Sequence, residues 1–177
     1  MIVALLVLLA PLARAEVSDS AANGFTTVNE VIIAGSRAEA WVAAVNQIDQ
    51  WWHSDHTVSG DASRLSITAE MQGCFCETLG ETAGVVHLVV TMINPTNLLR
   101  MTGGLGPLGL MGVDGNMTWE FEDAEGGTLV RFTYAVGGYR EGGLDEIATP
   151  VDSVIGEALS RLKAYVETGN PELVSVE

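Results

Sequence analysis

The stretch PVDSVIGEALSRLKAYVE, from Pro150 to Glu167, decides the fold, because it is the only long amphipathic helix that the sequence predicts. Its apolar residues recur at helical spacing, so one stripe of this helix must be buried. The segments before it are typical of short strands, and we expect the stripe to lie on an antiparallel sheet. A straight helix cannot contact a curved sheet along its whole length, which predicts an apolar cavity for a small molecule. The stripe consists of Val151, Val154, Ile155, Ala158, Leu159, Leu162, Tyr165 and Val166.

The first fifteen residues have the pattern of a secretory signal peptide. An apolar run from Ile2 to Leu12 is followed by Ala13-Arg14-Ala15, a sequence typical of a cleavage site, and the run is too short to span a bilayer. We expect cleavage after Ala15 and an exported protein, periplasmic or secreted. A buried N-terminal helix or a lipid-facing anchor is the alternative. Residues 16–24 are small and polar, and we expect a flexible lead.

Length and charge restrict the organisation and the partners. The chain of 177 residues carries 8 basic and 23 acidic side chains, for a net charge of −15. Its length predicts a single domain, over residues 25–168, with a tail at 169–177. An acidic surface repels phosphate backbones and anionic headgroups, so we expect no nucleic acid partner and no stable membrane insertion after cleavage. We interpret the acidity as a source of solubility, and an acidic patch for cationic partners is the alternative. We expect a monomer or weak dimer.

The segments before the final helix predict an α+β fold of about six to seven strands. Ser36 and Glu39 form a capping box, which predicts a helix from Arg37 to about Ile48. Short turns between the later segments predict hairpins. The expected strands are 26–33, 65–71, 74–79, 85–94, 98–102, 116–123 and 128–136.

The last hairpin has the clearest alternation of apolar and polar residues. If Asp123 pairs with Thr128, Trp119 lies opposite Phe132, and the same register pairs two further apolar couples. We expect this aromatic face to lie against the terminal helix. The further couples are Phe121 with Val130 and Met117 with Tyr134.

The order of strand, helix, Trp51-Trp52, strand meander and long terminal helix resembles the helix-grip fold of the START-like (SRPBCC) superfamily. The segments 41–52, 65–77, 98–103, 117–121 and 151–162 are most similar to the branch of heat-shock ATPase activator homologues (AHSA1-like) and to polyketide cyclase-like bacterial proteins. The resemblance covers about residues 26–167. It implies a curved sheet wrapped around the terminal helix, with a cavity between them and the glycine-rich loop 103–115 near its mouth. That loop would be either a mobile apolar lid or a packed loop.

The glycine-rich loop is not a nucleotide site, because its glycines lack the lysine and the Ser/Thr of a P-loop. We therefore expect no nucleotide and no other obligatory cofactor.

Cys74 and Cys76 share one face of a predicted hairpin. If Leu79 pairs with Gly84, Cys76 lies opposite His87, and two sulfurs with an imidazole form a candidate zinc or copper site. Three ligands without a CxxC spacing make a weak metal motif. A disulfide is also doubtful, because alternate residues of one strand lie near the limit of bridgeable separation. Structural burial of both cysteines, a metal and redox or nucleophilic chemistry remain alternatives, with burial preferred.

Glu77 lies on the face opposite the cysteines, which we expect to be the cavity side. A carboxylate in an apolar cavity must be protonated, paired, or used to orient a ligand or act as a base. Arg140 and Tyr134 are its possible neighbours. Glu77 is therefore the candidate catalytic residue, although a strand twist that turns it to solvent is the alternative.

The segment His53-Ser54-Asp55-His56 suggests a metal or acid/base cluster, but it has no helical HExxH frame. We interpret it as a solvated loop.

These observations favour a protein that binds a hydrophobic, lipid-like or aromatic small molecule in a cavity. An enzyme of the polyketide cyclase or hydrolase type is the alternative, with Glu77 or the Cys76 and His87 pair as acid/base groups. A metal- or thiol-dependent hairpin site and an interaction module acting through the acidic face are further alternatives. The residues expected to line the cavity are Trp51, Phe75, Glu77, Met101, Trp119, Phe132, Tyr134, Ile155 and Leu159.

Overall fold

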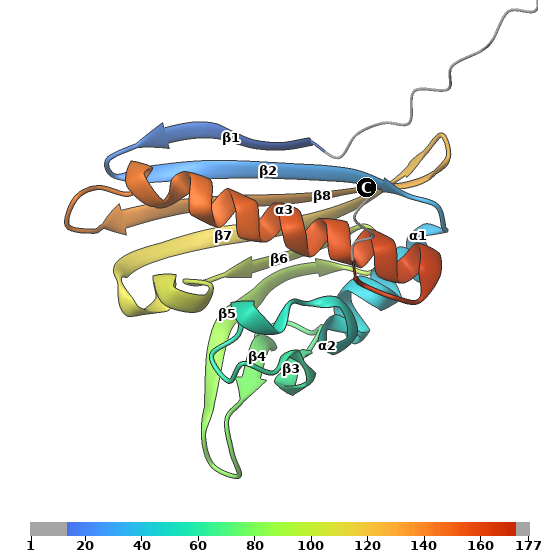
Figure 1. The fold of residues 1–177 in the computed structure, drawn as a ribbon, viewed down its shortest axis with the longest axis horizontal. Coiled ribbons are helices and arrows are strands. Elements are labelled where there is room, and N and C mark those ends of the chain that lie inside the picture. Colours follow the sequence, from blue (N-terminus) through green and yellow to red (C-terminus); the bar gives the residue numbers. More distant parts are fainter. Residues whose placement is uncertain (1–13, 173–177) are drawn as a thin grey trace, which may run out of the picture.

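A single antiparallel sheet and one long helix dominate the computed structural model, which describes residues 14–172. Eight strands follow the order β1-β2-β8-β7-β6-β5-β4-β3, and helix α3 lies across one face of the sheet (Figure 1). This arrangement confirms the predicted α+β helix-grip class. The strands are β1 (Arg14–Ala21), β2 (Gly24–Ile33), β3 (Leu65–Ile67), β4 (Cys74–Thr78), β5 (Gly84–Asn94), β6 (Leu98–Thr102), β7 (Gly112–Ala124) and β8 (Gly127–Tyr139).

The structure contains one strand more than the seven expected, and this additional strand is β1, in a region where the sequence predicts a flexible lead. β1 pairs antiparallel with β2, and a register irregularity lies between Val17 and Asp19. The small polar residues of β1 show no alternation, because most of them are exposed on an edge strand. Residues 1–13 of the expected signal peptide and residues 173–177 of the expected tail lie outside the described part of the chain.

The predicted helix after β2 begins as expected and is then interrupted. Ser36 and Glu39 form the capping box at the start of α1 (Arg37–Trp41). A π-helical turn (Val42–Asn46) and the short helix α2 (Ile48–Trp51) follow, so the continuous helix expected to Ile48 is wrong. The interruption lies at Gln47, whose φ of −129° is not helical.

The hairpin of β7 and β8 has the predicted register. Trp119 pairs with Phe132, and their rings stack with centroids 4.3 Å apart. Both side chains are buried, so this part of the sheet forms the floor of the main core. The other two predicted couples, Phe121 with Val130 and Met117 with Tyr134, are also present.

Helix α3 (Asp145–Thr168) is 24 residues long and continues through Pro150. It ends at Gly169, whose φ of 76° is the left-handed conformation that glycine adopts at low cost. Two buried polar contacts fix the helix on the core: Asn29 Nδ2 donates to Asp152 Oδ1 at 2.9 Å, and Arg161 Nε donates to the carbonyl oxygen of Trp51 at 2.9 Å. Within residues 14–172, no helix has both the length and the hydropathy required to cross a membrane.

Candidate functional site

An apolar cavity of about 700 Å³ lies beside the N-terminal half of α3. Its walls come from α3, from β5, from the segment 55–58 and from the glycine-rich loop 104–111. The sequence predicts a cavity against α3 with that loop near it, and both features are present. The lining residues are Trp52, Asp55, His56, Thr57, Val58, Val85, Val86, His87, Gly104, Leu105, Gly106, Pro107, Leu108, Gly109, Leu110, Met111, Tyr134, Ile147, Pro150, Val151, Val154 and Ile155.

The rim of this cavity exposes apolar side chains to solvent. Val58, Val86 and Leu110 all line it, and they are 58%, 60% and 92% exposed. Apolar surface gathered around a hollow is typical of a binding site, because scattered exposed residues do not converge in this way.

The expected lining residues divide into two groups. Tyr134 and Ile155 line the cavity, whereas most of the others lie in the packed core. Trp52 is in the cavity wall in place of Trp51, whose ring packs on Trp119 and whose Nε1 donates to the carbonyl oxygen of Ala43 at 2.9 Å. The core members of the expected set are Trp51, Phe75, Met101, Trp119, Phe132 and Leu159.

Glu77 is buried and is not one of the residues that line the cavity, contrary to the prediction, and its partners also differ from those expected. Its Oε2 accepts from the backbone N–H of Val58 at 2.9 Å, and its Oε1 accepts from the backbone N–H of Ser59. His87 Nε2 lies 3.0 Å from Oε2. The carboxylate therefore joins β4 to β5 and to the loop that forms one cavity wall.

The two neighbours expected for Glu77 are engaged elsewhere. Arg140 binds the carbonyl oxygen of Gly143 and the Glu146 carboxylate. Tyr134 binds the glycine-rich loop.

Hydrogen bonds keep the Glu77 carboxyl charged despite its burial. Burial acts to raise its pKa, but donors at Ser59, Val58 and His87 together hold the pKa below its ordinary value. An acceptor with several N–H donors is stabilised in its ionised form, which explains how a carboxylate persists at 1% exposure.

A β-bulge brings His87 to Glu77. Cys74 pairs with Val89 and Phe75 with Leu88, but Cys76 pairs with Val86, so His87 is the extra residue of the bulge. The predicted pairing of Cys76 with His87 is therefore wrong. His87 turns to the buried face, where its ring contacts Phe75 and its Nδ1 has no hydrogen-bond partner within residues 14–172.

Cys74 and Cys76 form a disulfide, contrary to the expectation from their spacing in the sequence. Their Cα atoms are 5.4 Å apart, within the bridgeable range. The bonded sulfurs do not offer the thiolates of the candidate metal site with His87, and the Cys76 and His87 acid/base pair is excluded by the same bond.

Tyr134 fastens the glycine-rich loop to the sheet. Its hydroxyl donates to the carbonyl oxygen of Gly103 at 2.8 Å and accepts from the backbone N–H of Leu105 at 3.0 Å. Burial of the phenol, with a smaller contribution from the Asp114 charge, raises the pKa of Tyr134 to about 12, although the hydrogen bond from the N–H of Leu105 acts to lower this pKa. The hydroxyl is thus a neutral anchor for one wall of the cavity.

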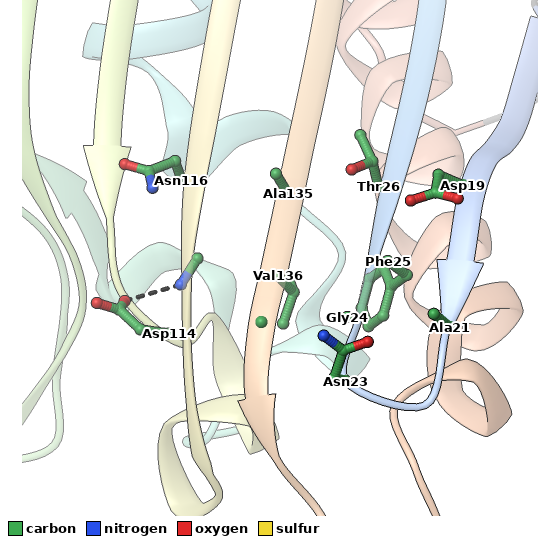
Figure 2. Close-up of a pocket in the computed structure, with 12 residues that line it drawn as sticks. Asp19, Ala21, Asn23, Gly24, Phe25, Thr26, Asp114, Asn116, Ala135 and Val136 are labelled. Atoms are coloured by element: carbon green, nitrogen blue, oxygen red, sulfur yellow. Dashed lines mark hydrogen bonds between the residues drawn. The ribbon is translucent and has the colours of Figure 1, made fainter.

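A second, smaller hollow of about 410 Å³ has a different character. It lies over β1, β2, β8 and β7, and Figure 2 shows α3 behind these strands. Asp19, Thr26, Asp114 and Asn116 border it. Asp114 Oδ1 accepts from the N–H of Gly115 at 2.8 Å. Polar side chains make up a larger share of its lining than they do in the larger cavity.

The loop 103–115 is predictable as part of the cavity from the sequence, whereas the wall segment 55–58 and the β5 residues Val85 and Val86 are not. Val85 and Val86 lie in a predicted strand without a signal for which face they occupy, because the bulge at His87 changes the alternation. The exposed Val58 in an otherwise polar segment is the one signal that could have indicated a functional surface.

The sheet order and the long terminal helix define a helix-grip protein, with an apolar cavity beside α3. The chain belongs to the family described as Polyketide cyclase / dehydrase and lipid transport, whose sequence model matches residues 24–167. No curated protein matches the chain significantly.

Solved structures share this fold at low sequence identity. A conserved protein of unknown function from Enterococcus faecalis has a TM-score of 0.61 at 15% identity, over 93% of this chain and 82% of its own. The Aha1 dimer from Colwellia psychrerythraea has a TM-score of 0.56 at 16% identity, over 81% and 97%. CalU16 from Micromonospora echinospora has a TM-score of 0.56 at 13% identity, over 92% and 88%. At such identities the likeness establishes the fold.

Proposed function

We propose that this protein binds a hydrophobic or aromatic small molecule, lipid-like in character, in the cavity beside α3. The observation that carries the proposal is the convergence of exposed apolar side chains on a hollow of about 700 Å³. Its volume lies in the range of small-molecule sites, about 300–1,000 Å³. Burying the apolar rim under a ligand is favourable at roughly 25 cal/mol per Å².

The polar groups of the cavity support orientation of a ligand. Among its lining residues, Asp55, His56 and His87 are the ionisable ones besides the neutral phenol of Tyr134. A few polar groups in an apolar wall select the orientation of a ligand without supplying most of the affinity. The occupant is therefore an amphipathic molecule with an apolar body and a small polar end.

The identity of the occupant is tested with protein purified from its native source. The purified protein is denatured in organic solvent and the released material is analysed by mass spectrometry. One apolar compound recovered at about one equivalent per chain supports the proposal. Repeated recovery of nothing, from preparations whose folded state is verified, contradicts tight carriage.

A cyclase or hydrolase activity is the second candidate, favoured by the Glu77 and His87 pair. In the tautomer whose Nε2–H donates to Glu77 Oε2, Nδ1 of His87 carries the lone pair that a general base requires. Nδ1 is buried, so a substrate reaches it only after a local shift of the ring or loop. This requirement ranks the enzyme below simple binding.

The two candidates differ in what a His87→Gln variant retains. If His87 is a base, the variant purified from the same cells releases a compound of different mass from that of the wild type, because the substrate accumulates. If the protein is a carrier, both release the same compound.

We also propose export, periplasmic or secreted, and a monomer or weak dimer. The apolar run Ile2 to Leu12 supports export, as does a disulfide at Cys74 and Cys76, because such bonds persist in oxidising compartments. The structurally similar Aha1 protein is a dimer, which is compatible with the weak dimer proposed for this chain. N-terminal sequencing of the native protein tests cleavage after Ala15, and sedimentation tests the oligomeric state.

A further inference from the structure

Two histidines and a glutamate meet at the rim of the cavity. His53 caps a short helical turn (Ser54–His56) of which His56 is the last residue, and Glu157 belongs to α3. His56 Nε2 lies 3.1 Å from Glu157 Oε2, and His53 Nε2 lies 3.9 Å from Glu157 Oε1. One potential ligand atom from each of the three residues lies within 4.8 Å of the other two. These side chains are 29–36% exposed, so the cluster is neither buried nor fully solvated.

The separations between these atoms suit a divalent metal. A zinc ion holds imidazole and carboxylate ligands at about 2.0–2.1 Å, which places neighbouring ligand atoms of a tetrahedron about 3.3 Å apart. In the structure the separations are 3.1 Å to Glu157 Oε2 and 3.9 Å to Glu157 Oε1, and one ligand atom from each residue lies within 4.8 Å of the other two. Small side-chain rotations would therefore complete the geometry without moving α3 or the loop.

A second carboxylate is placed to support one of the imidazoles. Asp55 Oδ2 lies 3.9 Å from His53 Nδ1, whose present contact is the backbone N–H of Asp55 at 3.1 Å. When His53 binds metal through Nε2, its proton moves to Nδ1, and the ring turns from the N–H to the Asp55 carboxylate. Ligating histidines usually donate their second N–H to such a group.

We propose that His53, His56 and Glu157 form a zinc-type metal site at the rim of the cavity. Two imidazoles and one carboxylate suit zinc among the common divalent ions, and three protein ligands leave a fourth position for water or an external oxygen ligand. A net charge of −15 favours cations near the surface. Because His56 also lines the cavity, the metal lies next to the ligand space.

The solvated loop that the sequence predicts for residues 53–56 becomes a site only with Glu157, about a hundred residues later in the chain. The site needs no occupant of the cavity. It is therefore tested independently of the proposed small-molecule function.

The test uses untagged full-length protein that has been stripped of metal with a chelating resin. Zn²⁺ is titrated by calorimetry near neutral pH, and Co²⁺ is added separately as a spectroscopic probe. We expect one Zn²⁺ per chain and visible Co²⁺ absorption of the tetrahedral type. Glu157→Ala and His56→Ala should each weaken binding at least about tenfold, and His53→Ala should do the same.

Glu81→Ala is the matched control, because Glu81 is exposed in the β4–β5 loop and its loss removes the same charge from a residue outside the cluster. We expect unchanged Zn²⁺ affinity in this variant. Circular dichroism verifies folding of each protein. Failure of the wild type to bind, equal affinity in Glu157→Ala, or equal weakening in Glu81→Ala would each overturn the proposal, the last because it indicates adventitious attraction to an acidic surface.

Discussion

His87 Nε2 lies 3.0 Å from Glu77 Oε2, and both side chains are buried. This contact crosses from β5 to β4, and the same carboxylate also binds the backbone of Val58 and Ser59. The pair therefore fixes the segment 55–58, which forms one wall of the cavity. A charge at this depth is tolerated only while all of these donors are present.

Glu77→Gln should destabilise the protein at neutral pH by about 2–3 kcal/mol, because a charged acceptor of three hydrogen bonds is replaced by a group with one acceptor. Urea denaturation measures the free energy of unfolding. Glu81→Gln, at an exposed loop position, is the matched control and should change it little. A loss no greater than that of the control would show that the buried contacts contribute nothing.

The contribution of Glu77 should disappear in acid. Its folded pKa lies below the ordinary value, so the unfolded chain binds a proton first as the pH falls. The contribution of Glu77 to the free energy of unfolding is fully present above the pKa of a glutamate in the unfolded chain, about 4.3. It is lost as the pH falls through the lower pKa that Glu77 has in the folded protein. The difference in unfolding free energy between wild type and Glu77→Gln should narrow over this window. If this difference in unfolding free energy stayed constant with pH, the predicted loss of the Glu77 contribution in acid would be contradicted.

Tyr134→Phe should loosen the glycine-rich loop. The substitution removes the hydroxyl that binds Gly103 and Leu105, and each lost hydrogen bond costs about 0.5–1.5 kcal/mol. We expect faster amide hydrogen exchange over residues 103–111, with little change in β2. Tyr139→Phe is the control, because this tyrosine is 76% exposed. Equal exchange in wild type and Tyr134→Phe would show that the hydroxyl does not hold the loop.

Reduction of the Cys74 and Cys76 disulfide should have a small effect on stability. The bond closes a loop with a sequence separation of 2, and chain entropy then accounts for only about 1.5 kcal/mol. Urea denaturation with and without reductant measures the difference, and Cys74→Ser with Cys76→Ser supplies a permanently open form. A loss of the folded state on reduction would contradict the prediction. Free thiols in protein purified from its native source would show that the bond is absent.

The regular parts of this fold are encoded locally, which explains their success as predictions. The β7–β8 register follows from strict alternation and a short turn between Asp123 and Thr128. Helix α3 follows from one apolar stripe that ends near Gly169. In both cases the pattern that sets the local structure also sets its buried face.

The site depends on irregularities that alternation does not encode. The single extra residue His87 shifts the register of β5, so it meets Glu77 instead of Cys76. Trp52, and not Trp51, lies in the cavity wall. Helix α2 ends between these two residues, and no pattern in the sequence indicates where α2 ends. Contacts between distant segments, such as His56 with Glu157, appear only once the chain has folded.

The most direct test of the binding function is a fluorescence titration with N-phenyl-1-naphthylamine, a neutral aromatic probe of apolar sites. We expect saturable binding of one probe per chain, weakened at least about tenfold, or about 1.4 kcal/mol, in the cavity-filling variant Val154→Trp. Val42→Trp, on an exposed position away from the cavity, and Trp119→Phe, in the packed core, should bind as the wild type does. Equal affinity in Val154→Trp and the wild type, with both proteins folded, would contradict ligand binding in this cavity.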